Sequence, residues 1–163
     1  MSEAYLLLGS NLGDRKDIFR KSAEMIEERI GIIQKKSSLY ESEPWGFESS
    51  SGFLNQVLVV QTSMDPWEIL NQIKQIESSL GRKRSHTGKY TSRTIDIDIL
   101  FYDKEVYQTQ DLTIPHPLLQ ERRFTLLPLE EIAPEYVHPG FNKNIRELLE
   151  DCPDHSTVNK LEE

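Results

Sequence analysis

Two aspartates, Asp96 and Asp98, stand two positions apart in the stretch of residues 93–102. Isoleucines occupy the positions between them and on either side, and this alternation is typical of a β-strand with one face in a core. Both carboxylates then lie on the other face, with their backbones about 7 Å apart. Aspartate is a poor strand former, so the pair indicates a function, for which binding of one or two divalent cations is the first candidate. A strand face that is acidic and simply solvated is the alternative.

A basic segment precedes these aspartates. Between Gly81 and Thr94 the chain carries five basic residues and no acidic one, namely Arg82, Lys83, Arg84, Lys89 and Arg93. Arginines next to a metal site are the arrangement expected for a polyphosphate ligand. The alternative is a solvated cationic loop, but the combination with the paired aspartates favours phosphate chemistry.

His116 is a further candidate, because it stands between Pro115 and Pro117. The two prolines restrict the backbone around it and so fix the position of the imidazole. A single histidine is more often structural or merely exposed, so the sequence leaves both roles open.

Composition limits the class of protein. The chain has 163 residues, 37% of them hydrophobic, which predicts one domain over residues 1–163 with a polar tail, expected to be frayed, from about residue 151. A net charge of −8 disfavours a nucleic-acid or anionic-membrane partner. Cys152 is the single cysteine, which excludes an intrachain disulfide and a cysteine zinc cluster. With neither a signal-like segment nor an apolar run long enough to span a membrane, we expect a cytoplasmic protein.

The elements that must position these residues follow from hydrophobic periodicity and turn signals. Strands are predicted at about 4–8, 32–43, 53–62 and 93–102, and helices at about 14–30, 65–80 and 145–150. In the helix that starts at Asp65, this residue is the expected N-cap, and Leu70, Ile73, Ile76, Glu77 and Leu80 form the expected inner face. The order of strands and helices predicts an α+β, ferredoxin-like sandwich, with a mainly antiparallel sheet and helices packed on it.

Six short motifs occur in order: Gly-Ser-Asn-Leu-Gly at 9–13, Phe-Leu-Asn at 53–55, Gly-Arg-Lys-Arg at 81–84, Arg-Thr-Ile-Asp-Ile-Asp-Ile at 93–99, Pro-His-Pro at 115–117 and Arg-Arg-Phe at 122–124. In this set the chain resembles the 6-hydroxymethyl-7,8-dihydropterin pyrophosphokinases of folate biosynthesis, over roughly residues 4–140. The resemblance implies that ATP donates its terminal pyrophosphate unit to the hydroxymethyl group of a reduced pterin and that AMP is released.

The resemblance also implies roles for single residues. Asp96 and Asp98 are the expected shared ligands of two Mg²⁺ ions, and Arg82, Arg84 and Arg93 the expected cations around the phosphates. Further implied ATP contacts are Glu77, Ile99, His116 and Arg122, together with Arg84 and Arg93.

For the pterin, the resemblance implies an aromatic sandwich and amide partners. Phe53 and Phe124 match the stacking positions, and Asn55 matches the side chain that binds the edge of the ring. The other expected pterin contacts are Ser42, Pro44, Trp45 and, from a lid, Tyr90. Without the resemblance, the phenylalanines are more simply core residues.

The chain departs from the family at two places. Tyr90, Thr91 and Ser92 stand where the family usually has Trp-Gly-Pro, which removes a rigid turn from the expected lid. Lys74 stands where a glutamine is common, which weakens the case for an ATP contact there.

Two other functions are compatible with the expected fold. A ferredoxin-like sheet can bind single-stranded RNA, but that function requires a basic sheet face with central aromatics, where this chain has two aspartates. A regulator that binds nucleotide or metal without turnover is the second alternative. We expect a monomer whose partners are ATP and a reduced pterin.

Overall fold

The computed structural model of the chain describes residues 1–10, 15–42, 53–81 and 95–161. Its elements, in chain order, are β1 (Ser2–Ser10), α1 (Arg15–Arg29), β2 (Ile32–Lys36), β3 (Tyr40–Ser42), β4 (Phe53–Thr62), α2 (Pro66–Ser79), β5 (Asp96–Tyr102), β6 (Tyr107–Gln108), β7 (Thr113–Ile114), the 3₁₀ helix η1 (Leu119–Glu121), α3 (Arg123–Ile132), α4 (Ile145–Glu150) and β8 (Val158–Lys160). None of the helices in these described parts is long and apolar enough to cross a bilayer.

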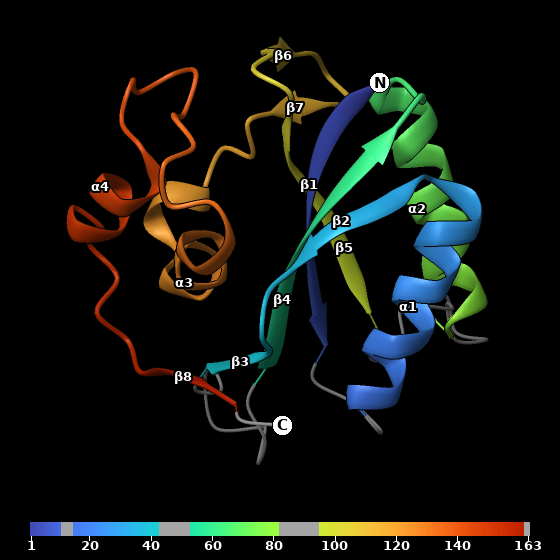
Figure 1. The fold of residues 1–163 in the computed structure, drawn as a ribbon, viewed down its shortest axis with the longest axis horizontal. Helices are drawn as coiled ribbons and strands as arrows, with labels where there is room; N and C mark the ends of the chain where they lie inside the picture. Colours follow the sequence, from blue (N-terminus) through green and yellow to red (C-terminus); the bar gives the residue numbers. More distant parts are fainter. Residues whose placement is uncertain (11–14, 43–52, 82–94, 162–163) are drawn as a thin grey trace.

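The main sheet has the strand order β5-β1-β4-β3-β8, and β2 also pairs with β4. All of its pairings are antiparallel. Helices α1 and α2 cover one face, and α3 and α4 lie over the other (Figure 1). This arrangement confirms the predicted α+β, ferredoxin-like architecture, to which α3, α4 and β8 are additions.

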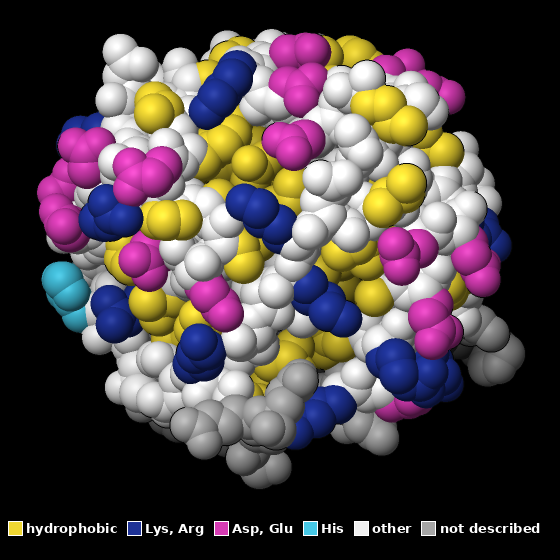
Figure 2. Space-filling view, viewed as in Figure 1, with side chains coloured by type: hydrophobic (Ala, Val, Ile, Leu, Met, Phe, Trp, Pro, Cys, Tyr) yellow, Lys and Arg dark blue, Asp and Glu magenta, His cyan; other side chains and the backbone are white. Residues whose placement is uncertain are grey.

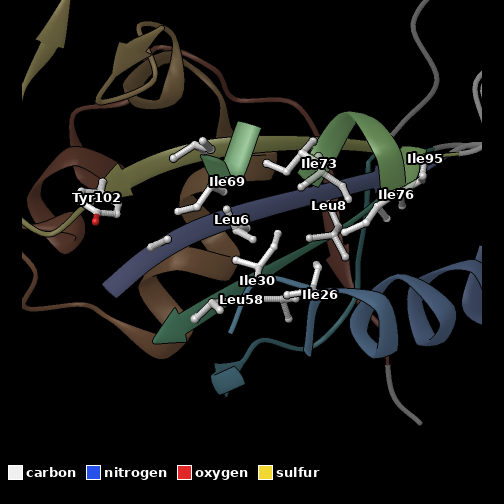
Figure 3. Packing of buried hydrophobic residues seen from close by; sticks show 14 of the residues in the cluster. Leu6, Leu8, Ile26, Ile30, Leu58, Ile69, Ile73, Ile76, Ile95 and Tyr102 are labelled. Atoms are coloured by element: carbon white, nitrogen blue, oxygen red, sulfur yellow. The ribbon is translucent and has the colours of Figure 1, made fainter. Parts of the chain in front are cut away.

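A large apolar core lies between the sheet and the helices α1 and α2. Side chains from β1, β4 and β5 meet those of both helices there, among them Leu6, Leu58, Ile26 and Ile73 (Figure 3). A second apolar cluster lies on the opposite face, where Tyr5, Leu7 and Val57 contact α3 and α4. The sheet is therefore buried on both faces over much of its area.

Strand β5 confirms the predicted alternation. Ile95, Ile97 and Ile99 belong to the first core, and Asp96 and Asp98, being half-buried, point away from it. The pairing with β1 shifts by one residue at Leu100, because Tyr5 pairs with Phe101 while Leu6 pairs with Ile99. This β-bulge adds a residue beyond the aspartates and changes the direction of the strand.

Helix α2 begins as predicted. Asp65 accepts a hydrogen bond from the Glu68 amide at 2.8 Å, and Glu68 accepts one from the Asp65 amide at 3.0 Å, a complete capping box. The predicted inner face omitted one residue, because Ile69 is fully buried, while the predicted Leu70 and Leu80 are only partly buried. Leu70 and Leu80 pack against the same core.

The single strand predicted over 32–43 is two strands, β2 and β3, separated at Ser37. Ser37 Oγ accepts a hydrogen bond from the Val57 amide at 2.9 Å, and the Ser37 carbonyl accepts one from Gln56 Nε2 at 2.8 Å. A side chain thus replaces one bond of the backbone ladder and interrupts the strand.

The tail is not frayed, contrary to expectation, as far as residue 161. Cys152 is buried, and β8 pairs with β3 in register from Tyr40 opposite Lys160 to Ser42 opposite Val158. The tail is polar because its strand lies at the sheet edge, where backbone hydrogen bonds rather than apolar side chains hold it.

We expect Gly31→Ala to lower the free energy of unfolding by about 2–3 kcal/mol or more, because close contacts of this kind force backbone shifts. A Cβ at Gly31, between α1 and β2, would lie 2.0 Å from the Gln61 carbonyl oxygen, which is backbone and cannot rotate away. Urea unfolding measures the change. The matched control is Gly140→Ala, whose Cβ would meet the His138 side chain at 3.1 Å and should cost less; equal losses would contradict this account.

Candidate active site

Three strands bring Gly9, Asn55 and Asp96 into one row. Gly9 of β1 pairs with Asn55 of β4 on one side and with Asp96 of β5 on the other. Two residues further along, Leu7 pairs with Asp98. Because residues paired across a sheet share a face, Asn55 and both aspartates line the face that α3 partly covers.

Little space is left beside Gly9. A Cβ there would lie only 3.0 Å from Asn55 Oδ1. Asn55 itself is 4% exposed, and its Nδ2 has no hydrogen-bond partner among the described residues. A buried amide left in this state costs about 1–3 kcal/mol, so its environment suits a ligand that offers an acceptor.

The first of two cavities beside the aspartates, the aromatic cavity, has a volume of about 500 Å³. It is lined by Leu7, Gly9, Ser42, Phe53, Asn55, Asp96, Asp98, Leu118, Glu121, Arg122 and Phe124. Phe53 and Phe124 are only half-buried, which favours a role in binding over the alternative that they are core residues. An apolar cavity with a few polar groups is typical of a site for a flat organic ligand.

The second, the helix cavity, has a volume of about 700 Å³ and lies between α2 and the edge of β5. Its lining residues are Leu70, Ile73, Lys74, Glu77, Ser78, Asp96, Ile97, Asp98, His116 and Arg122. Three residues, Asp96, Asp98 and Arg122, line both cavities. The two cavities therefore meet at the paired carboxylates and one guanidinium group.

Arg122 stands at the start of α3, next to the aromatic wall. Its guanidinium carbon lies 5.6 Å from the centre of the Phe124 ring, within the range of a cation–π interaction. The Arg122 side chain lines both cavities. Its guanidinium group can therefore contact an anion in one cavity while the aliphatic part of the side chain packs against a ring in the other.

The bulge in β5 positions His116. The Leu100 carbonyl accepts a hydrogen bond from the His116 amide at 3.0 Å, and His116 Nδ1 accepts one from the Leu118 amide at 3.2 Å. Burial lowers the pKa of His116; the charge of Arg122 acts in the same direction, and Asp98 opposes both. The ring is therefore neutral near pH 7, with its proton on Nε2, which makes Nε2 a hydrogen-bond donor for an anionic ligand.

Glu77 has a positioning role that the sequence did not predict. It is 6% exposed, and its Oε2 accepts a hydrogen bond at 2.9 Å from the Ile97 amide, between the two aspartates. The carboxylate thus fixes the edge strand against α2. Ile99, an expected ATP contact, places its side chain in the core and lines neither cavity, so this contact stays a prediction without support from the cavity linings.

Carboxylates are suitable ligands for Mg²⁺. No group of three or more His, Cys, Asp or Glu side chains in the described parts of the chain is arranged to hold a metal. Magnesium usually binds through one or two carboxylates, with water and substrate phosphates as its other ligands. Asp96 and Asp98, at the junction of two cavities, fit that kind of site.

Several predicted site residues lie outside the described residues: Pro44, Trp45, Arg82, Arg84, Tyr90 and Arg93. The predicted site residues that the structure describes lie around the two cavities, apart from the Ile99 side chain. Gly9, Leu118 and Glu121 also line the aromatic cavity, although no site role was predicted for them. Gly9 belongs to a motif, whereas the other two lie between motifs and gave no signal.

A third cavity of about 490 Å³ lies between α1 and β2, away from the aspartates. Four of its six charged lining residues are already bonded: Arg20 pairs with Glu24 on its own helix, Glu27 accepts a hydrogen bond from the Ile33 amide, and Lys35 donates to the Ile132 carbonyl. It is a solvated groove rather than a prepared site.

Fold and site together define a ferredoxin-like protein in which an aromatic-lined cavity and a charged cavity meet at paired carboxylates. The chain belongs to the 7,8-dihydro-6-hydroxymethylpterin-pyrophosphokinase (HPPK) family, whose sequence model matches residues 5–134.

Named relatives agree with this assignment. A 2-amino-4-hydroxy-6-hydroxymethyldihydropteridine pyrophosphokinase of Aquifex aeolicus is 46% identical over 148 residues, covering 91% of each chain. The enzyme of the same name from Bacillus subtilis is 40% identical, covering 80% of this chain and 77% of its own. The folic acid synthesis protein FOL1 of Dictyostelium discoideum is 38% identical over 96% of this chain but only 23% of its own length.

A solved structure shows the same fold. The HPPK-DHPS protein of Plasmodium falciparum superposes with a TM-score of 0.76 at 21% identity, over 92% of this chain. This chain spans 43% of that one, less than half of its length. At this level of identity the similarity concerns the fold.

We expect Glu77→Ala to lower the free energy of unfolding by about 1–3 kcal/mol, because the buried Ile97 amide loses its acceptor. Urea unfolding provides the measurement. The control is Lys74→Ala, which removes an exposed side chain from the same helix and the same cavity. Glu77 and Lys74 variants of equal stability would show that this hydrogen bond does not hold β5.

Proposed function

We propose that this chain transfers the terminal pyrophosphate unit of ATP to the hydroxymethyl group of 6-hydroxymethyl-7,8-dihydropterin, releasing AMP, as a step of folate biosynthesis. Family membership and the names of the relatives support the reaction. The observation that carries the proposal is the meeting of the two cavities at Asp96, Asp98 and Arg122. A transfer between two bound molecules requires such a junction, because donor and acceptor must be held in line.

The pterin binds in the aromatic cavity. A pterin is flat, so Phe53 and Phe124 are suited to stack on it, and its edge carries acceptors for the unpaired Asn55 Nδ2. Ser42 lines the same wall, because it pairs with Phe53 across β3 and β4. The hydroxymethyl group then points toward the two aspartates.

ATP binds in the helix cavity with its triphosphate toward the same aspartates. Arg122 and the Nε2 proton of His116 contact phosphate oxygens. Lys74, which replaces the family's common glutamine, lines this cavity as well and adds positive charge to it. Arg82, Arg84 and Arg93 are proposed to complete the cationic environment, with Arg84 and Arg93, like Glu77, among the ATP contacts.

In the reaction, the hydroxymethyl oxygen attacks the β-phosphorus of ATP. The bond from that phosphorus to the oxygen bridging to the α-phosphate breaks, AMP leaves with that oxygen, and the hydroxyl proton passes to solvent. Two Mg²⁺ ions, when bound, neutralise charge on the triphosphate. Asp96 and Asp98 hold them, and Arg122 stabilises charge on the phosphate oxygens from the side of the pterin.

The chain acts as one catalytic domain, as a monomer and in the cytoplasm. The two cavities are built from elements that span β1 to α3, which supports a single catalytic unit. Cys152 is a free, buried thiol, as is usual in a reducing compartment.

The two alternatives have less support. The open part of the sheet carries Asp96 and Asp98, which would repel the phosphates of RNA. On the face seen in Figure 2, acidic and basic side chains are interspersed rather than gathered into a basic surface. A regulator without turnover would keep both cavities, so only an assay separates it from an enzyme.

The decisive assay is incubation with ATP, Mg²⁺ and the reduced pterin. Formation of AMP and pterin diphosphate in equal amounts is expected, with AMP formation dependent on the pterin. Binding of both ligands without AMP would support the regulator instead. Omission of Mg²⁺ and addition of a chelator should stop turnover.

Asp96→Ala and Asp98→Ala should each remove nearly all turnover, because either change removes a shared ligand. The free energy of unfolding should stay within about 1 kcal/mol or rise, because each change relieves repulsion between two carboxylates. AMP formation and urea unfolding measure the two effects. Asp111→Ala, which removes an exposed carboxylate elsewhere, is the control, and near-normal turnover by either site variant would rule out the shared-ligand assignment.

Asn55→Ala should weaken pterin binding by about 1–3 kcal/mol while ATP binding stays nearly unchanged, since Asn55 lines only the aromatic cavity. Separate calorimetric titrations of the two ligands test this. Gln56→Ala is the control, because Gln56 is also buried but bonds Ser37 outside the site. If Asn55→Ala weakened both ligands equally, or neither, Asn55 would not bind the ring edge.

A further inference from the structure

The last part of the chain, residues 152–161, forms a strap between two elements that face each other across the aromatic cavity. It lies outside residues 5–134, the part that the family's sequence model matches. In Figure 1 it leaves the end of α4, passes below α3 and reaches β3, beside which β8 lies.

Asp154 attaches the strap to the first turn of α3. Its Oδ2 accepts a hydrogen bond from the Arg123 amide at 3.0 Å, and its Oδ1 accepts one from the Ser156 amide at 3.0 Å. Burial alone would raise the pKa of Asp154, but the hydrogen bonds from Ser156 and the Arg123 amide, with the Arg123 charge, lower it. Arg122, the N-cap of α3, makes no cap hydrogen bond with its own side chain, so Asp154 supplies the acceptor at this helix start.

The residues on either side of Arg123 belong to the site. Phe124 lines the aromatic cavity, and Arg122 lines both cavities. The position of the first turn of α3 therefore sets the position of one aromatic wall. Asp154 lines neither cavity, and its link to that wall is the hydrogen bond from the Arg123 amide.

The other end of the strap is attached to the opposite wall. Val158 pairs with Ser42, and the Leu161 amide donates to the Leu39 carbonyl at 2.8 Å. Ser42 in turn pairs with Phe53 of β4, and both line the aromatic cavity. Lys160 Nζ also lies 3.6 Å from Glu131 Oε2 of α3, a second link between the strap and that helix.

We propose that this strap sets the separation of the Phe53 and Phe124 walls and so controls pterin affinity, with Asp154 as a positioning residue. The inference rests on the proposed function, because it takes the pterin as the ligand of the aromatic cavity. Stacking depends on ring separation to within a few tenths of an ångström, since dispersion falls steeply with distance. ATP binding depends less on this separation, because Arg122 reaches the helix cavity through a long side chain.

The test is calorimetric titration of the full chain with the reduced pterin and, separately, with ATP. Asp154→Ala is expected to weaken pterin binding about tenfold, the scale of losing one helix cap, and ATP binding less than about threefold. Asp154→Asn keeps one oxygen acceptor, so its pterin affinity should lie between those of the unchanged chain and Asp154→Ala. The matched control is Asp151→Ala, which removes an exposed carboxylate at the end of α4, just before the strap, whose partner is Lys143; it should titrate like the unchanged chain.

A merely stabilising role would lower the melting temperature and the active fraction without changing either dissociation constant. A double-mutant cycle separates that role from positioning. If Asp154 acts through the Phe124 wall, Asp154→Ala should cost no further pterin affinity in a Phe124→Ala background. Additive losses of pterin affinity, or an Asp154→Ala chain that titrates like the unchanged chain, would overturn the proposed role of the strap and leave the proposed function standing. An unchanged chain that binds no pterin would overturn both proposals.

Discussion

The site depends on one constraint: two like charges must be held side by side on a strand at the edge of a sheet. The isoleucines of β5 provide the anchor, because Ile95, Ile97 and Ile99 are buried in the core against α2. Glu77 adds a hydrogen bond to the Ile97 amide, between the two carboxylates. With the backbone fixed in this way, Asp96 and Asp98 stay on one face of the strand, and a cation bound there would reduce the repulsion between their charges.

The bulge at Leu100 divides β5 into two functional parts. On one side of it the strand carries the aspartates over an open part of the sheet, and on the other Leu100 and Phe101 pack against α3 and α4. The bulge also directs the Leu100 carbonyl to the His116 amide, which brings the Pro-His-Pro segment to the edge of the helix cavity. One extra residue thus ends the open face and places a hydrogen-bond donor beside it.

The sequence predicted what local patterns encode. The alternation in β5, the Asp65 capping box and the order of elements are local, and the structure confirms them. The row of Gly9, Asn55 and Asp96 depends on the register of three strands far apart in the chain, which no local pattern contains. The break between β2 and β3 was missed for the same reason, because Ser37 interrupts the strand through bonds to Gln56 and Val57 of β4.

The prediction of a frayed tail was wrong because it rested on the polar composition of the side chains, whereas β8 is held mainly by backbone hydrogen bonds. An edge strand exposed on both faces needs no apolar alternation, so its residues resemble those of a disordered end. Its attachment at Asp154 is likewise a side chain bonded to two amides, a pattern that Asp-Xaa-Ser shares with many turns. The motifs therefore supply most of the polar and aromatic residues that line the two cavities, while the segment that joins two walls of the aromatic cavity carries no motif.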